Sequence, residues 1–394
     1  SSNGLEKRPK LRFPGFDEQY KQCRIGDIYA ERSQRGASDM ELLSVTMNDG
    51  VKPRSEIEGK DNSSEDKSNY KIVRKGDMVY NSMRMWQGAN GISPCDGIVS
   101  PAYTVLMPKQ EINNGYFAAL FKSTNLINEF RKNSQGMTSD TWNLKYPQIE
   151  TIKVQIPSVS EQDKVSALFS VLDARIVAQA QLVESLKKYK RGVVRTLLSP
   201  KHCKLKNVEW TTAKIGNIGT FIKGAPLSKA DISSDGTPFI LYGELYTTYN
   251  EVISKVVRKT QASVDKQYYS QIGDVIIPTS GETPEEISTA SCVMLPDIIL
   301  AGDLNIYRCT QVDGRIMSYI LNHVVNDRIA RVAQGKSIVH VQATEISKIE
   351  ITYPDLISQK KLIETFDAIT ARIDQSMREL ELLQVHRKAL LQQL

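Results

Sequence analysis

Two long stretches of this 394-residue chain share one spacing of apolar residues. In residues 159–198 apolar side chains recur at alternating steps of four and three, without proline. That spacing is the heptad register of a coiled coil, so it predicts a long helix with one apolar seam. Ser160 is predicted to cap the start of this helix. The seam includes Val165, Phe169, Leu172, Ile176, Val183 and Leu186, with Gln179 and Lys190 in its polar slots.

Residues 356–394 repeat the pattern 197 residues later. Ser376 and Arg387 occupy the polar slots that Gln179 and Lys190 occupy in the first stretch. Two unrelated amphipathic helices are the alternative, but agreement at the polar slots as well favours a duplication. The second seam includes Leu362, Phe366, Ile369, Ile373, Leu380 and Leu383.

The duplication extends beyond the helices, which predicts the order globular unit, helix, globular unit, helix. The predicted boundaries are residues 1–157, 158–199, 200–354 and 355–394. The repeated motifs are Ile25-Gly26-Asp27-Ile28 with Ile215-Gly216-Asn217-Ile218, Gly76-Asp77 with Gly273-Asp274, and Gln135-Gly136 with Gln334-Gly335.

Inside each globular unit the pattern predicts a mixed α/β (α+β) fold. Residues 114–132 and 315–332 have helical periodicity. Residues 48–69 are polar and charged, which predicts a loop. Short strands are predicted at residues 78–83, 103–107, 151–156, 274–278, 304–309 and 348–352.

Composition narrows the class of protein only slightly. The chain is 40% hydrophobic and 24% charged, with a net charge of +6, so a polyanionic partner is permitted but not required. Neither an apolar run near 18 residues nor a signal sequence is recognisable, which predicts a soluble intracellular protein without a membrane partner. The five cysteines form no CxxC pair and are expected to be reduced.

Catalytic motifs are weak in this sequence. The segment 334–337, Gln-Gly-Lys-Ser, resembles the end of a phosphate-binding loop, but Ala330 stands where that motif needs glycine. Glu58 and Lys60, with Asp49 upstream, have the spacing of some nucleases, yet a solvated loop is the favoured interpretation. The four histidines form no cluster. We therefore expect a binding protein with no catalytic residue, metal site or cofactor of its own.

The candidate binding residues lie in polar, glycine-rich loops. Arginine and lysine neutralise phosphates, and arginine, glutamine and glutamate read base edges, although solvated surface is the alternative for each residue. In the first unit they are Arg32, Arg35, Lys75, Arg84, Trp86, Gln87 and Gln135. In the second unit they are Lys223, Thr279, Ser280, Glu282, Thr283, Gln334, Lys336 and His340.

Several stretches, in this order, resemble the specificity subunit of a type I restriction-modification enzyme over essentially the whole chain. They are Lys10-Leu11-Arg12-Phe13-Pro14-Gly15-Phe16, residues 76–88 from Gly76 to Gly88, residues 97–103, Gln135-Gly136-Met137 and Ser160-Glu161-Gln162. The second unit departs from the pattern: Pro278-Thr279-Ser280-Gly281-Glu282 replaces the Met-Arg-Met-Trp run of the first. Loop contacts therefore cannot be transferred from one unit to the other.

This resemblance implies two target-recognition domains that each read half of a split site in double-stranded DNA. It implies that the long helices pack antiparallel with pseudo-two-fold symmetry, act as a spacer and dock two modification subunits. It places S-adenosylmethionine in those methyltransferase subunits, ATP and Mg²⁺ in restriction subunits, and the complex in a bacterial or archaeal cytoplasm. Two alternatives remain open: a single-chain nuclease or methyltransferase, and a structural coiled-coil protein.

Overall fold

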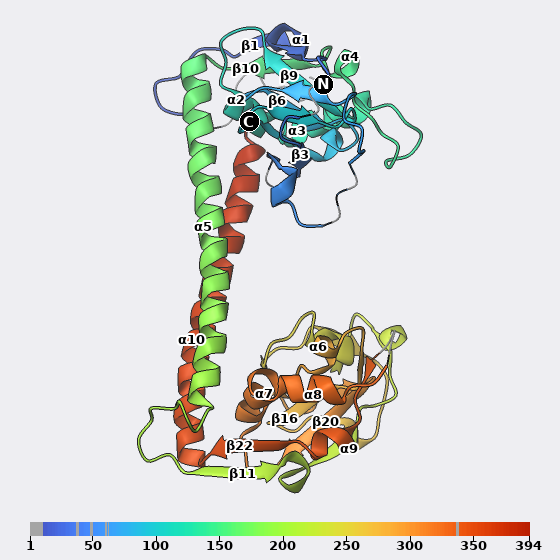
Figure 1. Ribbon diagram of the computed structural model, residues 1–394, viewed down its shortest axis with the longest axis vertical. Coiled ribbons are helices and arrows are strands. Elements are labelled where there is room, and N and C mark those ends of the chain that lie inside the picture. The colour runs from blue at the N-terminus through green and yellow to red at the C-terminus, as the bar shows by residue number, and fades with distance from the viewer. Residues whose placement is uncertain (1–10, 37–38, 48–49, 60, 62, 336–338) are drawn as a thin grey trace. The chain divides into compact units, whose positions relative to one another are not determined.

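The computed structural model describes residues 11–36, 39–47, 50–59, 61, 63–335 and 339–394. The chain forms two compact units. The first unit comprises residues 1–181 and 377–394, and the second comprises residues 182–376. Each unit therefore contains part of α5 (Val159–Leu197) and part of α10 (Leu356–Leu391), the two long helices of Figure 1.

The first unit is built around a four-stranded antiparallel sheet in the order β2-β9-β6-β7. Three two-stranded ladders, β1-β10, β3-β4 and β5-β8, accompany it. Its elements are β1 (Lys21–Arg24), α1 (Ile25–Ile28), β2 (Tyr29–Glu31), β3 (Leu43–Thr46), β4 (Gly50–Pro53), η1 (Arg54–Glu56), β5 (Lys71–Val73), β6 (Met78–Asn81), η2 (Met85–Gln87), β7 (Asn90–Ile92), β8 (Gly97–Val99), β9 (Tyr103–Pro108), α2 (Asn114–Leu120), α3 (Thr124–Asn133), α4 (Tyr146–Ile149) and β10 (Lys153–Ile156).

The second unit has a five-stranded sheet in the order β12-β20-β16-β18-β14, and α7 and α8 lie beside it in Figure 1. The strand β14 pairs parallel to β18. Its elements are β11 (Trp210–Lys214), η3 (Ile215–Asn217), β12 (Gly219–Lys223), η4 (Lys229–Asp231), β13 (Thr237–Leu241), η5 (Tyr242–Leu245), β14 (Val252–Ile253), β15 (Arg258–Thr260), η6 (Lys266–Tyr268), β16 (Asp274–Pro278), β17 (Ser280–Gly281), α6 (Pro284–Ile287), β18 (Ser291–Val293), β19 (Ile299–Ala301), β20 (Leu304–Cys309), α7 (Gly314–His323), α8 (Asn326–Val332), β21 (Val339–His340), α9 (Ala343–Ser347) and β22 (Glu350–Pro354).

The predicted mixed α/β class is confirmed, but four local predictions were wrong. The helix predicted at 114–132 breaks before α3, because Ser123 takes an extended conformation with φ −68° and ψ 147°. The helix predicted at 315–332 also breaks, at Val325, whose φ of −121° and ψ of 6° are neither helical nor extended. Residues 48–69 contain β4 and η1 as well as loop. Helix α5 begins at Val159, because the carbonyl of Ser158 already accepts the first helical hydrogen bonds, so Ser160 is not the cap.

The long helices present their seams to a partner within each unit. On α5, Val165, Phe169 and Val183 are buried, and Leu172, Ile176 and Leu186 are half-buried. On α10 the same holds for three buried residues, Leu362, Phe366 and Ile373, and three half-buried residues, Ile369, Leu380 and Leu383.

In the first unit the two helices run antiparallel, as predicted. Asp173 pairs with Arg387, and Gln179, further along α5, donates to Glu379, which comes earlier in α10 (3.2 Å). Leu391 of α10 lies in the same hydrophobic cluster as the start of α5. In the second unit the end of α5 shares a cluster with the start of α10. Each unit is therefore completed by the early part of one helix and the late part of the other.

One buried glutamine fixes the start of each long helix, and it recurs at the duplicated position. Gln162 accepts from the backbone N–H of Asn113 (2.9 Å) and donates to a proline carbonyl (3.1 Å). Gln359 likewise accepts from Asp313 N–H and donates to a proline carbonyl, both at 2.8 Å. Both glutamines are 1% exposed. Because Asn113 and Asp313 precede α2 and α7, each glutamine binds its long helix to its unit's sheet-covering helices.

Replacing either glutamine by alanine is expected to lower the free energy of unfolding by about 1–3 kcal/mol, because a buried N–H and a buried carbonyl lose their partners. The measurement is urea denaturation of Gln162→Ala and Gln359→Ala. Gln181→Ala, an exposed position on α5, is the control and should leave stability within about 0.5 kcal/mol of the parent. Equal stability in all three variants would contradict this role.

Among the described residues one helix, α5, is long and apolar enough to cross a membrane by length and composition alone. An 18-residue window of α5 reaches a mean hydropathy of 1.2. The sequence had been expected to contain no apolar run of that length. A single helix of this kind is weak evidence for a membrane span. In this structure the helix also carries Asp173, which is ion-paired with Arg387.

Candidate functional site

In both units a central strand, β6 or β16, ends in a polar loop. A second loop is hydrogen-bonded to that loop. In the first unit the backbone N–H of Leu144 donates to the carbonyl of Ser82 (2.8 Å). In the second unit Val341 donates to Thr279 (3.0 Å). Each residue of the second pair lies 197 positions after its counterpart in the first. The duplication therefore places two loops side by side at the same end of the central strand in each unit.

The joining loop is closed at its base in the same way in both units. Gln135 and Asn143 exchange two backbone hydrogen bonds, at 3.0 and 2.8 Å. Gln334 and His340 do the same at 2.9 and 2.8 Å. We call these closed segments the first and second hairpin loops. The repeated Gln-Gly motif of the sequence marks where each one begins.

In the first unit two tryptophans connect the two loops. Trp86 and Trp142 meet edge to face, with ring centroids 5.2 Å apart and an interplanar angle of 78°. The indole N–H of Trp86 donates to the carbonyl of Met83 (3.1 Å). The guanidinium of Arg131 lies 5.8 Å from the centroid of the Trp142 ring. A cation therefore adjoins an aromatic pair, a combination that suits nucleic-acid phosphates and bases.

Arg84 lies beside this aromatic pair and is exposed. Its backbone is held in place, since its N–H donates to Asn81 (3.0 Å) and its carbonyl accepts from Gln87 (2.9 Å). Among the described residues its guanidinium has no hydrogen bond or ion pair. An arginine with a fixed backbone and an uncommitted head can bind a base edge or a phosphate.

Arg32 and Lys75 lie away from the hairpin loop. Arg32 donates to both carboxylate oxygens of the buried Asp77, at 2.7 and 3.1 Å, and this hydrogen bonding raises the pKa of Arg32. Lys75 is exposed but precedes β6, whereas Arg84 follows it. Arg35 is exposed and bridges Lys71 through its backbone. Of these three cations, Arg32 is already committed to a structural ion pair.

The repeated Gly-Asp motif forms a turn before each central strand. Gly76 and Gly273 have φ of +92° and +95°, a region that favours glycine. Asp77 and Asp274 each accept a hydrogen bond from the backbone N–H three residues earlier, at 2.8 and 2.9 Å. The motif therefore shapes the turn at the opposite end of the strand from the hairpin loop.

In the second unit the hairpin loop extends a short ladder. Ser280 pairs with His340, so β17 and β21 run antiparallel at the end of β16. The hydroxyl of Ser280 donates to the carboxylate of Asp303 (3.1 Å), and the N–H of Thr279 donates to the carbonyl of the same residue (2.8 Å). Four of the sequence candidates, Thr279, Ser280, Gln334 and His340, are thus brought together.

Two further candidates of the second unit have structural partners. The hydroxyl of Thr283 accepts from the backbone N–H of Glu286 (3.2 Å) and caps the short helix α6. The backbone N–H of Glu282 donates to the Glu286 carboxylate (2.8 Å), while the side chain of Glu282 is exposed. Both side chains are exposed, but the Thr283 hydroxyl is committed to the cap of α6.

Lys223 comes to the same edge of the sheet as the β16 loop. It is the last residue of β12 and pairs with Asn305 of β20, which in turn pairs with Ile277 of β16. Lys223 is exposed, as is His340. Lys336 lies outside the described residues. This edge therefore mixes cationic and acidic side chains, whereas the first unit offers Arg84 and Arg131.

The sequence interpretation missed Arg131, Trp142 and Asp303. Arg131 lies in α3, within the segment predicted to be helical. Its guanidinium faces the Trp142 ring, which the helical pattern did not indicate. A tryptophan inside an otherwise polar segment after Gln135-Gly136 was the available signal for Trp142. No sequence motif marks Asp303, because only the pairing of β16 with β20 brings it next to Thr279 and Ser280.

Within the described ranges, no group of three or more histidine, cysteine, aspartate or glutamate side chains is arranged to hold a metal ion. Asp49 and Lys60 of the nuclease-like spacing lie outside those ranges. The same applies to Lys336 and Ser337 of the phosphate-loop resemblance. The described site geometry is thus that of exposed loops on a rigid strand end, which is suited to binding.

Comparison with known proteins agrees with this geometry. A family model described as "Type I restriction modification DNA specificity domain" matches residues 18–188 and again residues 207–384. A curated relative, the type I restriction enzyme MjaVIII specificity subunit of Methanocaldococcus jannaschii, is 21% identical over 347 residues, covering 81% of this chain and 78% of the relative.

Solved structures show the same fold over nearly the full chain. A chain from a structure of a type I R-M system aligns with a TM-score of 0.64 and 14% identity, covering 97% of this chain and 98% of that one. The type I restriction-modification S subunit from M. genitalium aligns with a TM-score of 0.56 and 14% identity, covering 98% of each chain.

Proposed function

This chain belongs to the type I restriction modification DNA specificity family, and from that premise we propose how its two units divide the reading of a DNA target. As a specificity subunit it provides target recognition for a restriction-modification complex and is not itself an enzyme. Each unit reads one half of a bipartite site in double-stranded DNA. The loop after the central strand and the hairpin loop together form the reading surface of each unit.

One observation carries this proposal. The Leu144–Ser82 and Val341–Thr279 hydrogen bonds join equivalent loops, yet the loops themselves differ in sequence. A shared scaffold with divergent exposed loops is what two readers of different sequences require. In the first unit the groups at this surface are exposed cations and half-buried tryptophan rings, which suits phosphates and base faces. In the second they include Glu282 and Lys223, which suits base edges as well as phosphates.

The wider assembly is part of the same proposal. Two modification subunits bind the long helices and supply S-adenosylmethionine, and restriction subunits supply ATP and Mg²⁺. The complex works in the cytoplasm of a bacterium or archaeon. The chain assembled with modification subunits should methylate a split motif, and single-molecule sequencing of the modified DNA reads that motif directly. Methylation or cleavage by the isolated chain would instead favour the single-chain enzyme.

Arg84→Ala is expected to weaken binding to the first half-site by about 1–3 kcal/mol, roughly 5- to 150-fold, if Arg84 makes a bidentate contact with guanine. Fluorescence anisotropy with the assembled complex should show relaxed preference at one position of that half-site alone. Lys153→Ala is the control, since Lys153 is an exposed cation on β10 and is not among the candidate binding residues. Uniformly weaker binding to all sequences, with a smaller salt dependence, would assign Arg84 to a phosphate instead.

A further inference from the structure

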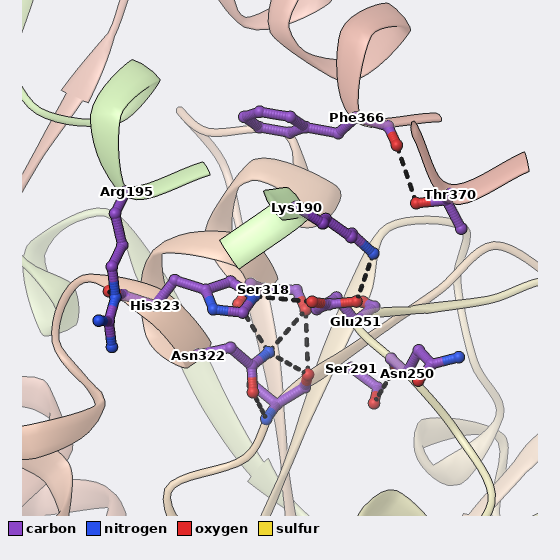
Figure 2. Close-up of polar contacts among 11 residues, drawn as sticks. Lys190, Arg195, Asn250, Glu251, Ser291, Ser318, Asn322, His323, Phe366 and Thr370 are labelled. Atoms are coloured by element: carbon purple, nitrogen blue, oxygen red, sulfur yellow. Dashed lines mark hydrogen bonds and ion pairs between the residues drawn. The ribbon is translucent and has the colours of Figure 1, made fainter. Parts of the chain in front are cut away.

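A buried carboxylate joins α5 to the body of the second unit. One oxygen of Glu251 accepts from Nζ of Lys190 on α5 (2.8 Å), and the other lies 2.7 Å from Nε2 of His323 on α7. The three side chains are 15%, 9% and 10% exposed. Figure 2 shows Glu251 between the other two residues. We call this arrangement the Lys190–Glu251–His323 bridge.

The backbone around Glu251 is fixed by a second set of polar contacts (Figure 2). The hydroxyl of Ser318 donates to the carbonyl of Glu251 (2.7 Å) and to that of Ala290 (3.0 Å). Ser291 donates to the carbonyl of Asn250 (2.7 Å). The carboxylate cannot follow a shift of α5 without breaking these hydrogen bonds, so α5 is bound to a rigid point.

Aromatic and backbone contacts close the surroundings of the bridge. Nζ of Lys190 lies 5.2 Å from the centroid of the Tyr319 ring, and that ring packs at 4.7 Å against Phe366 of α10. Arg195 of α5 donates to the backbone carbonyl of His323 (3.1 Å). Both long helices therefore meet α7 at this point, and the ammonium group has both a directional acceptor and a π-face.

The bridge is connected to the proposed reading surface through the sheet. Glu251 immediately precedes β14, which pairs with β18, and β18 pairs with β16. The end of β16 leads into Thr279 and Ser280. A change in the position of Glu251 relative to α5 is therefore a change in the position of the second reading surface relative to that helix.

The first unit uses the equivalent position differently. The slot that Lys190 occupies on α5 is filled by Arg387 on α10, 197 residues later. Arg387 pairs with Asp173 of α5 and lies 6.0 Å from the Phe169 ring centroid, so its partners are on the other helix. Among the described residues, the sheet of the first unit has no strand in the place of β14. The ion pair there connects α5 with α10 and includes no residue from the sheet of the first unit.

We propose that the Lys190–Glu251–His323 bridge holds the second unit in one orientation on α5, and that it thereby sets how strictly the complex discriminates the spacing between half-sites. Glu251 is a positioning residue in this role. Apolar seams tolerate small sliding movements, whereas two hydrogen bonds to one buried carboxylate are directional. The inference rests on the proposed function, since it concerns the geometry of half-site reading.

The test uses Lys190→Met in the full chain, assembled with its modification subunits. Methionine keeps the apolar packing against Tyr319, and Glu251 keeps its contact with His323, so only the Lys190–Glu251 bond is lost. Methylation rates are measured on DNA with the native spacer and with spacers one base pair shorter and longer. The preference for the native spacer should fall by about tenfold, which corresponds to ~1.4 kcal/mol. Both half-site sequences should still be required.

Arg387→Met is the matched control, because it removes the cation at the duplicated slot without touching the bridge. Its spacer preference should stay within about twofold of the parent. Equal spacer profiles in Lys190→Met, Arg387→Met and the parent would overturn the proposal, as would an equal loss in both variants. If Lys190→Met does not assemble, Glu251→Gln replaces it, and an unchanged spacer profile in that variant overturns the proposal too. A parent complex that methylates no bipartite site would instead refute the proposed function.

Discussion

Replacing Glu251 by alanine is expected to lower the free energy of unfolding of the second unit by about 3–5 kcal/mol, because Lys190 is left as a buried charge without its partner. Of the three tryptophans in the chain, only Trp210 belongs to the second unit. A parent with Trp86→Phe and Trp142→Phe would therefore let fluorescence during urea denaturation report on that unit alone. Thermal denaturation by calorimetry would check the same loss independently.

The matched control for this variant is Asp173→Ala, which removes the other carboxylate that pairs with a seam cation. Asp173 is 47% exposed in its side chain, so its loss should cost at most about 1 kcal/mol. Comparable destabilisation by both variants would show that burial of the bridge adds nothing to the free energy of unfolding. A cost below about 1 kcal/mol for Glu251→Ala would contradict the bridge as a stabilising contact.

The bridge also gives the second unit a defined acid sensitivity. Burial opposes ionisation of Glu251, but the hydrogen bond from His323 and the charge of Lys190 outweigh it and lower the pKa of Glu251 to about 2. A lowered pKa in the folded state means that the contribution to stability is complete above the ordinary value near 4.5 and is lost as the pH falls towards 2. In Glu251→Gln this part of the acid dependence should disappear.

Exchanging residues 1–157 for the matching domain of a relative is expected to change one half of the methylated motif completely. The other half and the spacer should stay as they were, because the second unit and both long helices are retained. Single-molecule sequencing of DNA methylated by the assembled complex reads both halves in one experiment. With half-sites on one face of B-DNA, their centres should be on the order of one helical turn apart, ~34 Å.

The reciprocal exchange of residues 200–354 is the control for this experiment and should change only the other half. A change in both halves after either exchange would refute independent reading by the two units. Residues 1–157 include both β1 and β10, so the exchange keeps this ladder within one domain.

The parts of the fold that could be predicted from the sequence are those in which apolar residues or motifs recur at a regular spacing. The seams of α5 and α10 follow a heptad pattern over many turns, so their apolar residues locate the buried face directly. The duplicated Gly-Asp and Gln-Gly motifs could be located in the same way. The break at Ser123 has no period, and its only local signal is a serine, a residue type that helix N-termini favour.

The candidate site was only partly predictable, because its residues are joined by contacts between distant segments. Gln135 and Arg84 were selected by residue type and loop context, but the Leu144–Ser82 hydrogen bond that brings their loops together has no sequence signal. Arg32 had the same residue type as Arg84, yet it is held by Asp77. Lys190 was recognised as a polar slot in a seam, and its partner Glu251 lies 61 positions further along the chain.

The division of each long helix between two units has a consequence for biosynthesis. The core of the first unit includes Leu391, with Leu390 and Leu394 packed against it, and all three are translated after the whole second unit. During synthesis the first unit therefore waits for a segment that leaves the ribosome after the second unit, while it already exposes the apolar face of α5. The second unit is a continuous stretch of chain and can close as soon as residue 376 is available. Nascent chains should thus acquire protease resistance in the second unit before the first.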